Sequence, residues 1–387
     1  MDEKPDGFRF SRSREAVLAS CFALLIGMFG VTAFVTRTYH KRTHQLADQW
    51  HEEGETALAA QRPEEAVTDF RNALVYSPNN SVFQFHLTQA LIAAHHWNDA
   101  EEYLQNLLSE TPGSGEINLS LARIAAEENS MVNALRYYQA AIYGSWEQNP
   151  IEMRWQTRYE LCEYLLSHNA MNQAEAEVIA LADNTAPGDR VNLLAAAKLL
   201  MQARLWTRAL DEFNLVLEID HHDAEALAGA GTAEFQMGHY EPVIDYFARL
   251  PKEKRSEPGI MAMMGEAQEV EAFSPRVAGL AVRAKARRTS AAVGAAEERV
   301  AACSQSLGQP IDSTSATTEL QKIYAEAEAK KREWSAIRLE LHPDQMADAL
   351  NAALEMEDAA TKRCGEPKSG IDRVLRLIAQ QGENPRQ

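Results

Sequence analysis

The sequence contains none of the motifs that mark the common enzyme classes. It has no phosphate-binding loop, nucleophile elbow, dinucleotide fingerprint or EF-hand pattern. His51 is followed by Glu52 and Glu53 but lacks the second histidine of a zinc-protease helix. His40 and His44 share one helix face, yet two ligands do not make a closed metal site. We therefore predict no catalytic residue, no metal site, no cofactor and no small-molecule substrate.

The sequence also has fewer basic than acidic residues. The chain has 38 Lys and Arg against 56 Asp and Glu, and its net charge is −18. Nucleic acid needs a basic face to neutralise its phosphates, so we predict no nucleic-acid partner. Anionic lipid would repel the same surface. Two interpretations of the acidity stay open: it keeps the protein soluble, or it attracts a basic partner.

The sequence does contain a repeating pattern of small residues. Small residues recur roughly every 34 positions inside amphipathic helical stretches. The first series is Gly54, Thr88, Ala122, Cys162, Ala197, Gly231 and Gly265. The second series is Ala66, Ala100, Ala134, Ala174, Ala209 and Val243, each followed four positions later by Phe70, Leu104, Tyr138, Val178, Phe213 and Phe247. This period is typical of stacked helix pairs, which build long concave binding surfaces.

The first unit of the pattern resembles the tetratricopeptide repeat family closely. The residues that carry the resemblance are Trp50, Gly54, Ala66, Phe70, Ala73 and Pro78. It extends over residues 47–273, with about six extra residues around 144–150 that shift the register before the fourth repeat. The resemblance implies an all-α solenoid over 47–305, with six repeats and a degenerate seventh whose second helix is long. It also implies a scaffold that binds other proteins.

The N-terminus predicts a membrane anchor. Residues 16–36 carry no charge and are nearly all apolar, which is the length that a helix needs to span a bilayer. We predict a tail at 1–15, a transmembrane signal-anchor helix at 16–36 and a juxtamembrane linker at 37–46. A removable signal peptide is the alternative, although its apolar core is usually shorter.

The flanking charges do not fix the orientation of the anchor. Four Lys and Arg residues precede the apolar segment and three follow it closely, so the positive-inside rule hardly decides. A short tail before the helix and a large domain after it favour export of the repeats. We therefore expect a single-pass inner-membrane protein whose repeats face the periplasm or the outside. Cytosolic repeats on a eukaryotic organelle remain the alternative if the orientation is reversed.

Two of the four cysteines are candidates for a disulfide. Cys303 and Cys364 each end a predicted helix just before a turn, and a bond between them would tie the last segment to the long helix after the repeats. Such a bond forms only in an oxidising compartment. Two separate, reduced cysteines are the alternative.

The chain beyond the repeats is predicted to be helical but not repetitive. We expect residues 274–303 to begin as the second helix of the seventh repeat and to continue as a capping helix, which gives the solenoid a polar end. Residues 316–380 are predicted to form a small helical cap docked on the solenoid. An independent helical hairpin is the alternative.

The family resemblance also indicates where a ligand lies. In similar proteins the first helix of each pair lines the groove, and residues three before and one after each crossing position face it. The peptide-binding residues predicted in this way are His51, Glu55, Phe85, Gln89, Leu119, Arg123, Tyr159, Glu163, Leu194 and Lys198. This set has an apolar floor and charged flanks, which suit an extended or helical peptide.

Some relatives grip a carboxylate with cations on this face. The matching positions here hold His51, Glu55, His86, Glu116 and Ser120, and the two acids would repel a carboxylate. The function favoured by the sequence is a membrane-anchored scaffold that binds a peptide segment of a protein partner, in envelope assembly, secretion or polymer export. The alternative is a regulatory or assembly subunit of an envelope enzyme complex that acts through its C-terminal cap.

Overall fold

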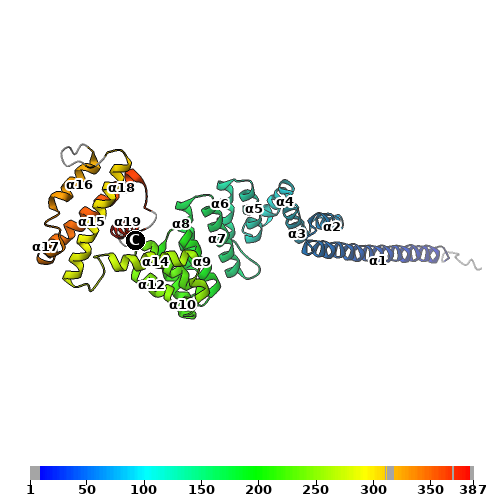
Figure 1. Cartoon of the computed structure of the whole chain (residues 1–387). Helices are drawn as coiled ribbons and strands as arrows, with labels where there is room; N and C mark the ends of the chain where they lie inside the picture. Colours follow the sequence, from blue (N-terminus) through cyan, green and yellow to red (C-terminus); the bar gives the residue numbers. More distant parts are fainter. Residues whose placement is uncertain (1–8, 310, 312–317, 368–369, 384–387) are drawn as a thin grey trace, which may run out of the picture. The chain divides into compact units, whose positions relative to one another are not determined.

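The chain folds into α-helices, as the repeat pattern predicts. The computed structural model describes residues 9–309, 311, 318–367 and 370–383. Every regular element in these ranges is a helix (Figure 1). The chain divides into two compact units, residues 1–161 and residues 162–387.

Consecutive helices pack on one another in the first unit. Its helices are α1 (Arg9–Ala59), α2 (Pro63–Tyr76), α3 (Ser81–Ala93), α4 (Trp97–Glu110), α5 (Gly115–Glu127), α6 (Met131–Ile142) and the first part of α7 (Pro150–Ser167). The pairs α1 with α2, α3 with α4 and α5 with α6 are each in close contact. The residues buried between them include four members of the predicted small and large apolar series, Ala66, Phe70, Ala100 and Leu104.

The predicted helix crossings are tight. A Cβ atom added to Gly54 would lie 2.7 Å from the ring of Phe70, and one added to Gly231 would lie 2.3 Å from the ring of Phe247. Glycine is therefore needed at these crossings because its partner aromatic ring occupies the space of a side chain. Gly265 stands on the same period, but nothing lies within 4 Å of its Cβ position.

The turn inside each helix pair has a left-handed residue. These residues have φ angles between 55° and 79°, and they are Gln61, His95, Asn129, Asn169, Arg204 and Gly238. A left-handed residue ends a helix by redirecting the backbone while the last carbonyls stay hydrogen-bonded. Only one of the six is glycine, so the residue types at these positions do not predict the left-handed backbone that they share.

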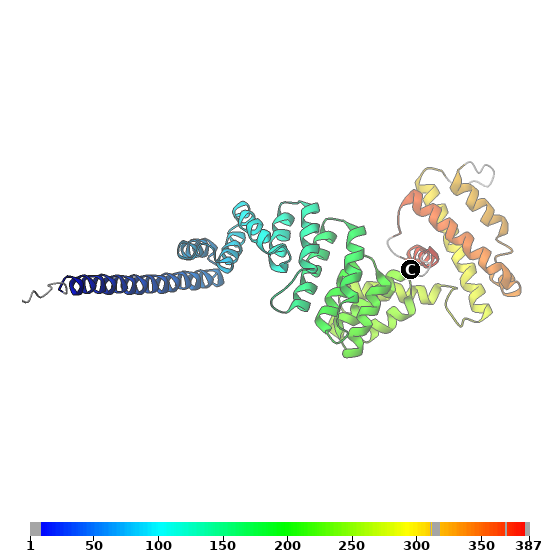
Figure 2. The same cartoon turned by 180° about the vertical axis from the view of Figure 1, so that it is seen from behind.

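Helix α1 is long and continuous. Its apolar part belongs to a helix long and apolar enough to cross a membrane, with a mean hydropathy of 2.2 in its most apolar window and no residue of that window buried (Figure 2). The predicted linker at 37–46 is helical as well and leads directly into the first helix of the repeats. The apolar segment and the first helix of the repeats thus belong to one continuous helix.

Consecutive helices also pack on one another within the second unit. Its helices after α7 are α8 (Met171–Asp183), α9 (Arg190–Gln202), α10 (Trp206–Ile219), α11 (Ala224–Met237), α12 (Tyr240–Ala248), α13 (Lys252–Arg255) and α14 (Pro258–Phe273). Asp223 starts α11 because its side chain accepts hydrogen bonds from the backbone N–H groups of Glu225 and Ala226. Its other carboxylate oxygen pairs with Arg190 on α9.

The C-terminal helices form a cluster with its own core. They are α15 (Val282–Ser306), α16 (Glu319–Lys330), α17 (Ala336–Leu341), the 3-10 helix η1 (Pro343–Gln345), α18 (Met346–Cys364) and α19 (Gly370–Glu383). Trp334, Leu339 and Met356 lie in this core beside alanines of α15 and α18. Helix α19 packs on α14, and Arg276, in the segment after α14, donates a hydrogen bond of 2.8 Å to the carbonyl of Ile378 on α19.

Helix α15 does not have the predicted place. We expected residues 274–303 to begin as the second helix of a seventh repeat and to continue as a capping helix, but the chain is not helical between Ser274 and Ala281. Pro275 disfavours helical backbone at Ser274, and Gly279 has a φ of +73°. Helix α15 starts after this break and packs on α16, α17, α18 and α19. It is thus the central helix of the cap.

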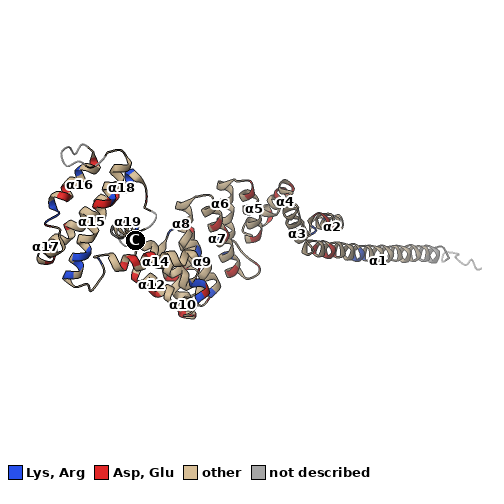
Figure 3. Ribbon diagram, viewed as in Figure 1, with Lys and Arg blue, Asp and Glu red and all other residues tan. Residues whose placement is uncertain are grey.

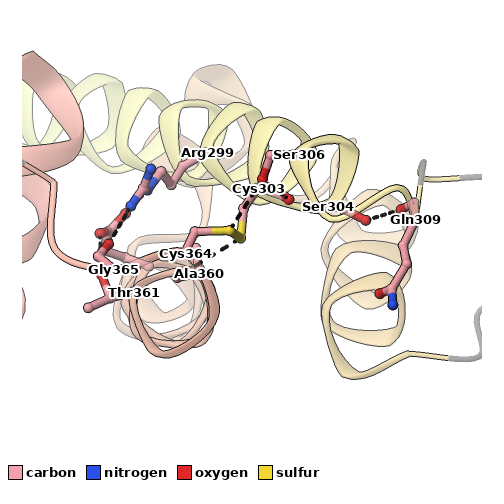
Figure 4. The surroundings of a disulfide bond; sticks show 10 residues. Arg299, Cys303, Ser304, Ser306, Gln309, Ala360, Thr361, Cys364 and Gly365 are labelled. Atoms are coloured by element: carbon pink, nitrogen blue, oxygen red, sulfur yellow. Dashed lines mark hydrogen bonds and ion pairs between the residues drawn. A yellow bond between two sulfur atoms is a disulfide. The ribbon is translucent and has the colours of Figure 1, made fainter.

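A disulfide joins Cys303 on α15 to Cys364 at the end of α18 (Figure 4). The two Cα atoms are 5.9 Å apart, and 61 positions separate the residues in sequence. Cys303 is buried, whereas Cys364 is exposed. Next to the bond, the Arg299 guanidinium donates a hydrogen bond of 2.9 Å to the Gly365 carbonyl. The two longest helices of the cap are therefore tied together at one end.

Candidate functional site

The first unit contains a cleft of about 950 Å³. It lies over the first helices of two neighbouring pairs, α3 and α5, and is bordered by the loop after α6 and by the start of α7. Four of the predicted groove residues line it: Phe85, Gln89, Leu119 and Arg123. All four come from α3 and α5, the first helices of their pairs.

The extra residues after the third repeat build one wall of the cleft. The Gly115 N–H donates to the Ser145 carbonyl and the Ser145 N–H donates to the Gly113 carbonyl, both at 2.8 Å. The Trp146 ring covers Gly115, where a Cβ atom would lie 2.3 Å from it. Its indole N–H donates to the Ala141 carbonyl at 3.0 Å. The sequence showed only a register shift here, but the insertion is an ordered part of the site.

Apolar residues, Phe85 and Leu119 among them, make up the smaller part of the cleft lining, and these two are called its floor. Phe85 is half-buried, and Leu119 is almost fully buried with 6% of its surface exposed. Arg123 extends from the floor and binds both carboxylate oxygens of Glu160 on α7, at 2.9 and 2.8 Å. The Tyr138 hydroxyl donates to the same carboxylate at 2.8 Å. Arg123 is thereby held in one orientation beside the floor.

One end of the cleft is acidic. Glu116 of α5 and Glu147 of the loop both line it. Burial raises the pKa of the Glu116 carboxyl, and the nearby charge of Glu147 raises it further. Figure 3 shows acidic residues along the helices of this unit. A cationic group bound at this end would relieve the repulsion between the two carboxylates.

The predicted residues His51 and Glu55 lie beside the cleft, with His86. The His51 Nε2 and His86 Nδ1 atoms are 2.7 Å apart, and a Glu55 oxygen is 3.4 Å from His86 Nδ1. His86 also lines the cleft. The sequence placed all three on one face, but it did not show that their nitrogen and oxygen atoms converge.

The other predicted groove residues lie elsewhere. Tyr159 stacks on Trp155 within α7, with ring centroids 5.4 Å apart. Glu163, Leu194 and Lys198 belong to the second unit. There Glu163 borders a small pocket of about 340 Å³, Leu194 is buried and Lys198 pairs with Glu225 at 2.7 Å. The described cleft therefore contains part of the predicted stripe.

Comparisons with known proteins agree with this fold. Residues 57–124, which include α3 and the first part of α5, match the tetratricopeptide repeat family model. No curated protein matches the sequence. Repeats of this kind typically act as non-enzymatic scaffolds for interactions between proteins.

Many solved structures are similar to this chain, and PilF, PilW and YrrB are among them. PilF of Pseudomonas aeruginosa is 16% identical, with a TM-score of 0.40, and the match covers 58% of this chain and 99% of that one. The type IV pilus biogenesis factor PilW is 16% identical, with a TM-score of 0.40 and coverage of 57% and 99%. YrrB, a TPR protein with an unusual peptide-binding site, is 13% identical, with a TM-score of 0.38 and coverage of 52% and 97%. Similarity at this level does not identify a partner for this chain.

Proposed function

We propose that this protein is a membrane-anchored scaffold that binds a peptide segment of a protein partner in the cleft over α3 and α5. The observation that carries the proposal is the cleft itself, whose mainly polar lining includes the apolar residues Phe85 and Leu119 and, at an acidic end, Glu116 and Glu147. Apolar floors bind side chains by removing them from water, and fixed charges at one end set the direction of a peptide. The expected ligand is an extended or helical segment with an apolar residue followed by Lys or Arg.

The apolar N-terminal helix supports the membrane part of the proposal. We propose that residues 16–36 remain as a single-pass anchor in the inner membrane, with the repeats in the periplasm or outside. The disulfide between Cys303 and Cys364 fits this orientation because such bonds persist in oxidising compartments. An anchored scaffold raises the local concentration of its partner at the membrane. Envelope assembly, secretion and polymer export are processes that use such a device.

The cleft is tested by site-specific photocrosslinking in cells. A photoreactive residue at Gln89, which is exposed and lines the cleft, is expected to capture the partner. The matched control is the same residue at Val132 on α6, which is 80% exposed and does not line the cleft. The Glu147→Lys variant reverses the acidic end and is expected to reduce capture at Gln89. Equal capture at Gln89 and Val132 would refute binding in the cleft.

The orientation is tested by protease treatment of cells whose outer envelope has been opened. Digestion of the C-terminus while the inner membrane is intact places the repeats outside it. Protection until lysis places them in the cytoplasm and refutes the exported orientation. Both results leave the cleft proposal standing, so the two parts are tested separately.

A second candidate is a regulatory or assembly subunit that acts through the C-terminal cap. The observation that favours it is the separate core of the cap, closed by the disulfide. It predicts that Phe85→Glu leaves function intact, whereas truncation at about residue 315 abolishes it. Loss of function in Phe85→Glu with the cap intact would favour the cleft.

A further inference from the structure

We propose that His51, Glu55 and His86 form a binding site for a divalent transition metal such as Zn²⁺. Each histidine supplies one imidazole nitrogen and the glutamate supplies one carboxylate oxygen. These three ligand atoms all lie within 4.8 Å of one another. Two histidines and a glutamate are a ligand set that zinc uses in sites with an open coordination position. The site joins α1 to α3 at the edge of the cleft and does not depend on peptide binding.

The distances are close to those of a tetrahedral site. His51 Nε2 and His86 Nδ1 are 2.7 Å apart, His86 Nδ1 and Glu55 Oε1 are 3.4 Å apart, and His51 Nε2 and Glu55 Oε1 are 3.9 Å apart. Bonds of about 2.0–2.1 Å to a tetrahedral zinc ion separate its ligand atoms by about 3.3 Å. Shifts of about 0.3 Å in each ligand atom bring all three distances to that value.

Helix geometry and repeat stacking explain the convergence. His51 and Glu55 are four residues apart on α1, so they lie on the same face one turn apart. His86 comes from the equivalent helix of the next repeat. The site therefore arises from two sequence-distant helices that the solenoid places side by side.

Aromatic rings hold the two imidazoles in place. The His51 ring stacks on Phe83, with centroids 4.4 Å apart, and on His86, with centroids 4.8 Å apart. Phe70 borders both histidine rings. Packing of this kind preorganises ligands, and the apolar surroundings strengthen their attraction to a metal ion.

The chemistry of the ligands sets the kind of metal. Imidazole nitrogens suit zinc, copper, nickel and cobalt, whereas magnesium and calcium prefer sets made only of oxygen. The Glu55 side chain is 51% exposed, against 14% for His51 and 27% for His86. The site therefore has one side open to solvent, where water can complete the coordination.

The test is zinc binding to the full-length protein in detergent, purified with a histidine-free tag and stripped with a chelator. We expect about one zinc per chain in competition with a chromogenic chelator, and a tetrahedral absorption spectrum when cobalt replaces zinc. His86→Gln and Glu55→Gln are each expected to weaken zinc binding by at least about 100-fold. Glu55 is exposed, so its variant keeps the fold, and circular dichroism checks this for both variants.

The control is the double variant His40→Gln and His44→Gln, which removes the other histidine pair on α1 and leaves the proposed site intact. We expect its zinc affinity to match that of the wild type. The proposal is overturned if the control variant loses the zinc, if His86→Gln and Glu55→Gln bind it as tightly as the wild type, or if the wild type binds no stoichiometric zinc.

Discussion

Removal of the Cys303–Cys364 disulfide is expected to loosen the cap without unfolding the repeats. The bond closes a loop with a sequence separation of 61 between α15 and α18. In the chain-entropy treatment, a loop of that length stabilises the folded state by about 4 kcal/mol. The Cys303→Ser and Cys364→Ser double variant should therefore lower the free energy of opening of α18 by about this amount.

Hydrogen exchange followed by mass spectrometry measures this effect locally. A loss of about 4 kcal/mol corresponds to a fall of roughly 1,000-fold in the protection of the α18 amides. Amides of α9 and α10 serve as the internal control because neither helix contacts α15 or α18 extensively. A reducing agent should lower the protection of α18 in the wild type and change nothing in the double variant. Unchanged protection of α18 in the oxidised and serine forms would refute the reasoning.

Three further predictions concern packing, protonation and capping in the second unit. Gly231→Ala should destabilise the protein by about 1–3 kcal/mol because the new methyl group meets the Phe247 ring. Gly265→Ala should stabilise it by about 0.5–1 kcal/mol because the new Cβ atom has open space around it. Urea unfolding of the two variants measures both changes in the free energy of unfolding. Burial raises the pKa of the Glu357 carboxyl to about 7, so the folded state holds its proton longer than the unfolded state does. Stability should then fall as pH rises from about 4.5 to about 7, and Glu357→Gln should remove on the order of 3 kcal/mol of that fall; an equal pH profile in both proteins would contradict the assignment. Asp223→Ala removes the α11 cap and the partner of Arg190, and should cost about 2 kcal/mol or more in thermal unfolding, while Asp223→Asn should retain the cap and lose less.

The repeat architecture was predictable from the sequence because packing constrains single positions. A helix crossing that places an aromatic ring on a neighbouring backbone admits only a small residue, so Gly54 with Phe70 and Gly231 with Phe247 recur at a readable spacing. The apolar run in α1 was predictable for a similar reason, since its length and lack of charge are local properties. Cys303 and Cys364 stood out because each precedes a helix-ending turn.

The candidate site was only partly predictable. The stripe of first-helix residues identified Phe85, Gln89, Leu119 and Arg123, because their place in the repeat sets the direction in which they face. The insertion after α6 gave no signal of its role. It became a wall of the cleft through backbone hydrogen bonds between Ser145 and the start of α5, which depend on contacts across the fold.

By itself, the sequence determined the elements of this protein: its helices, their period, the apolar N-terminal segment and the residues that let helices cross. Those properties depend on neighbours within one or two turns. The tertiary structure alone decided which distant side chains meet. It places His86 next to His51 of the preceding repeat. It also places α15 in the C-terminal cap, where α15 packs on α18, because the chain breaks its helix at Pro275 and Gly279. These contacts depend on the distance and angle between packed helices, which a local sequence pattern does not predict.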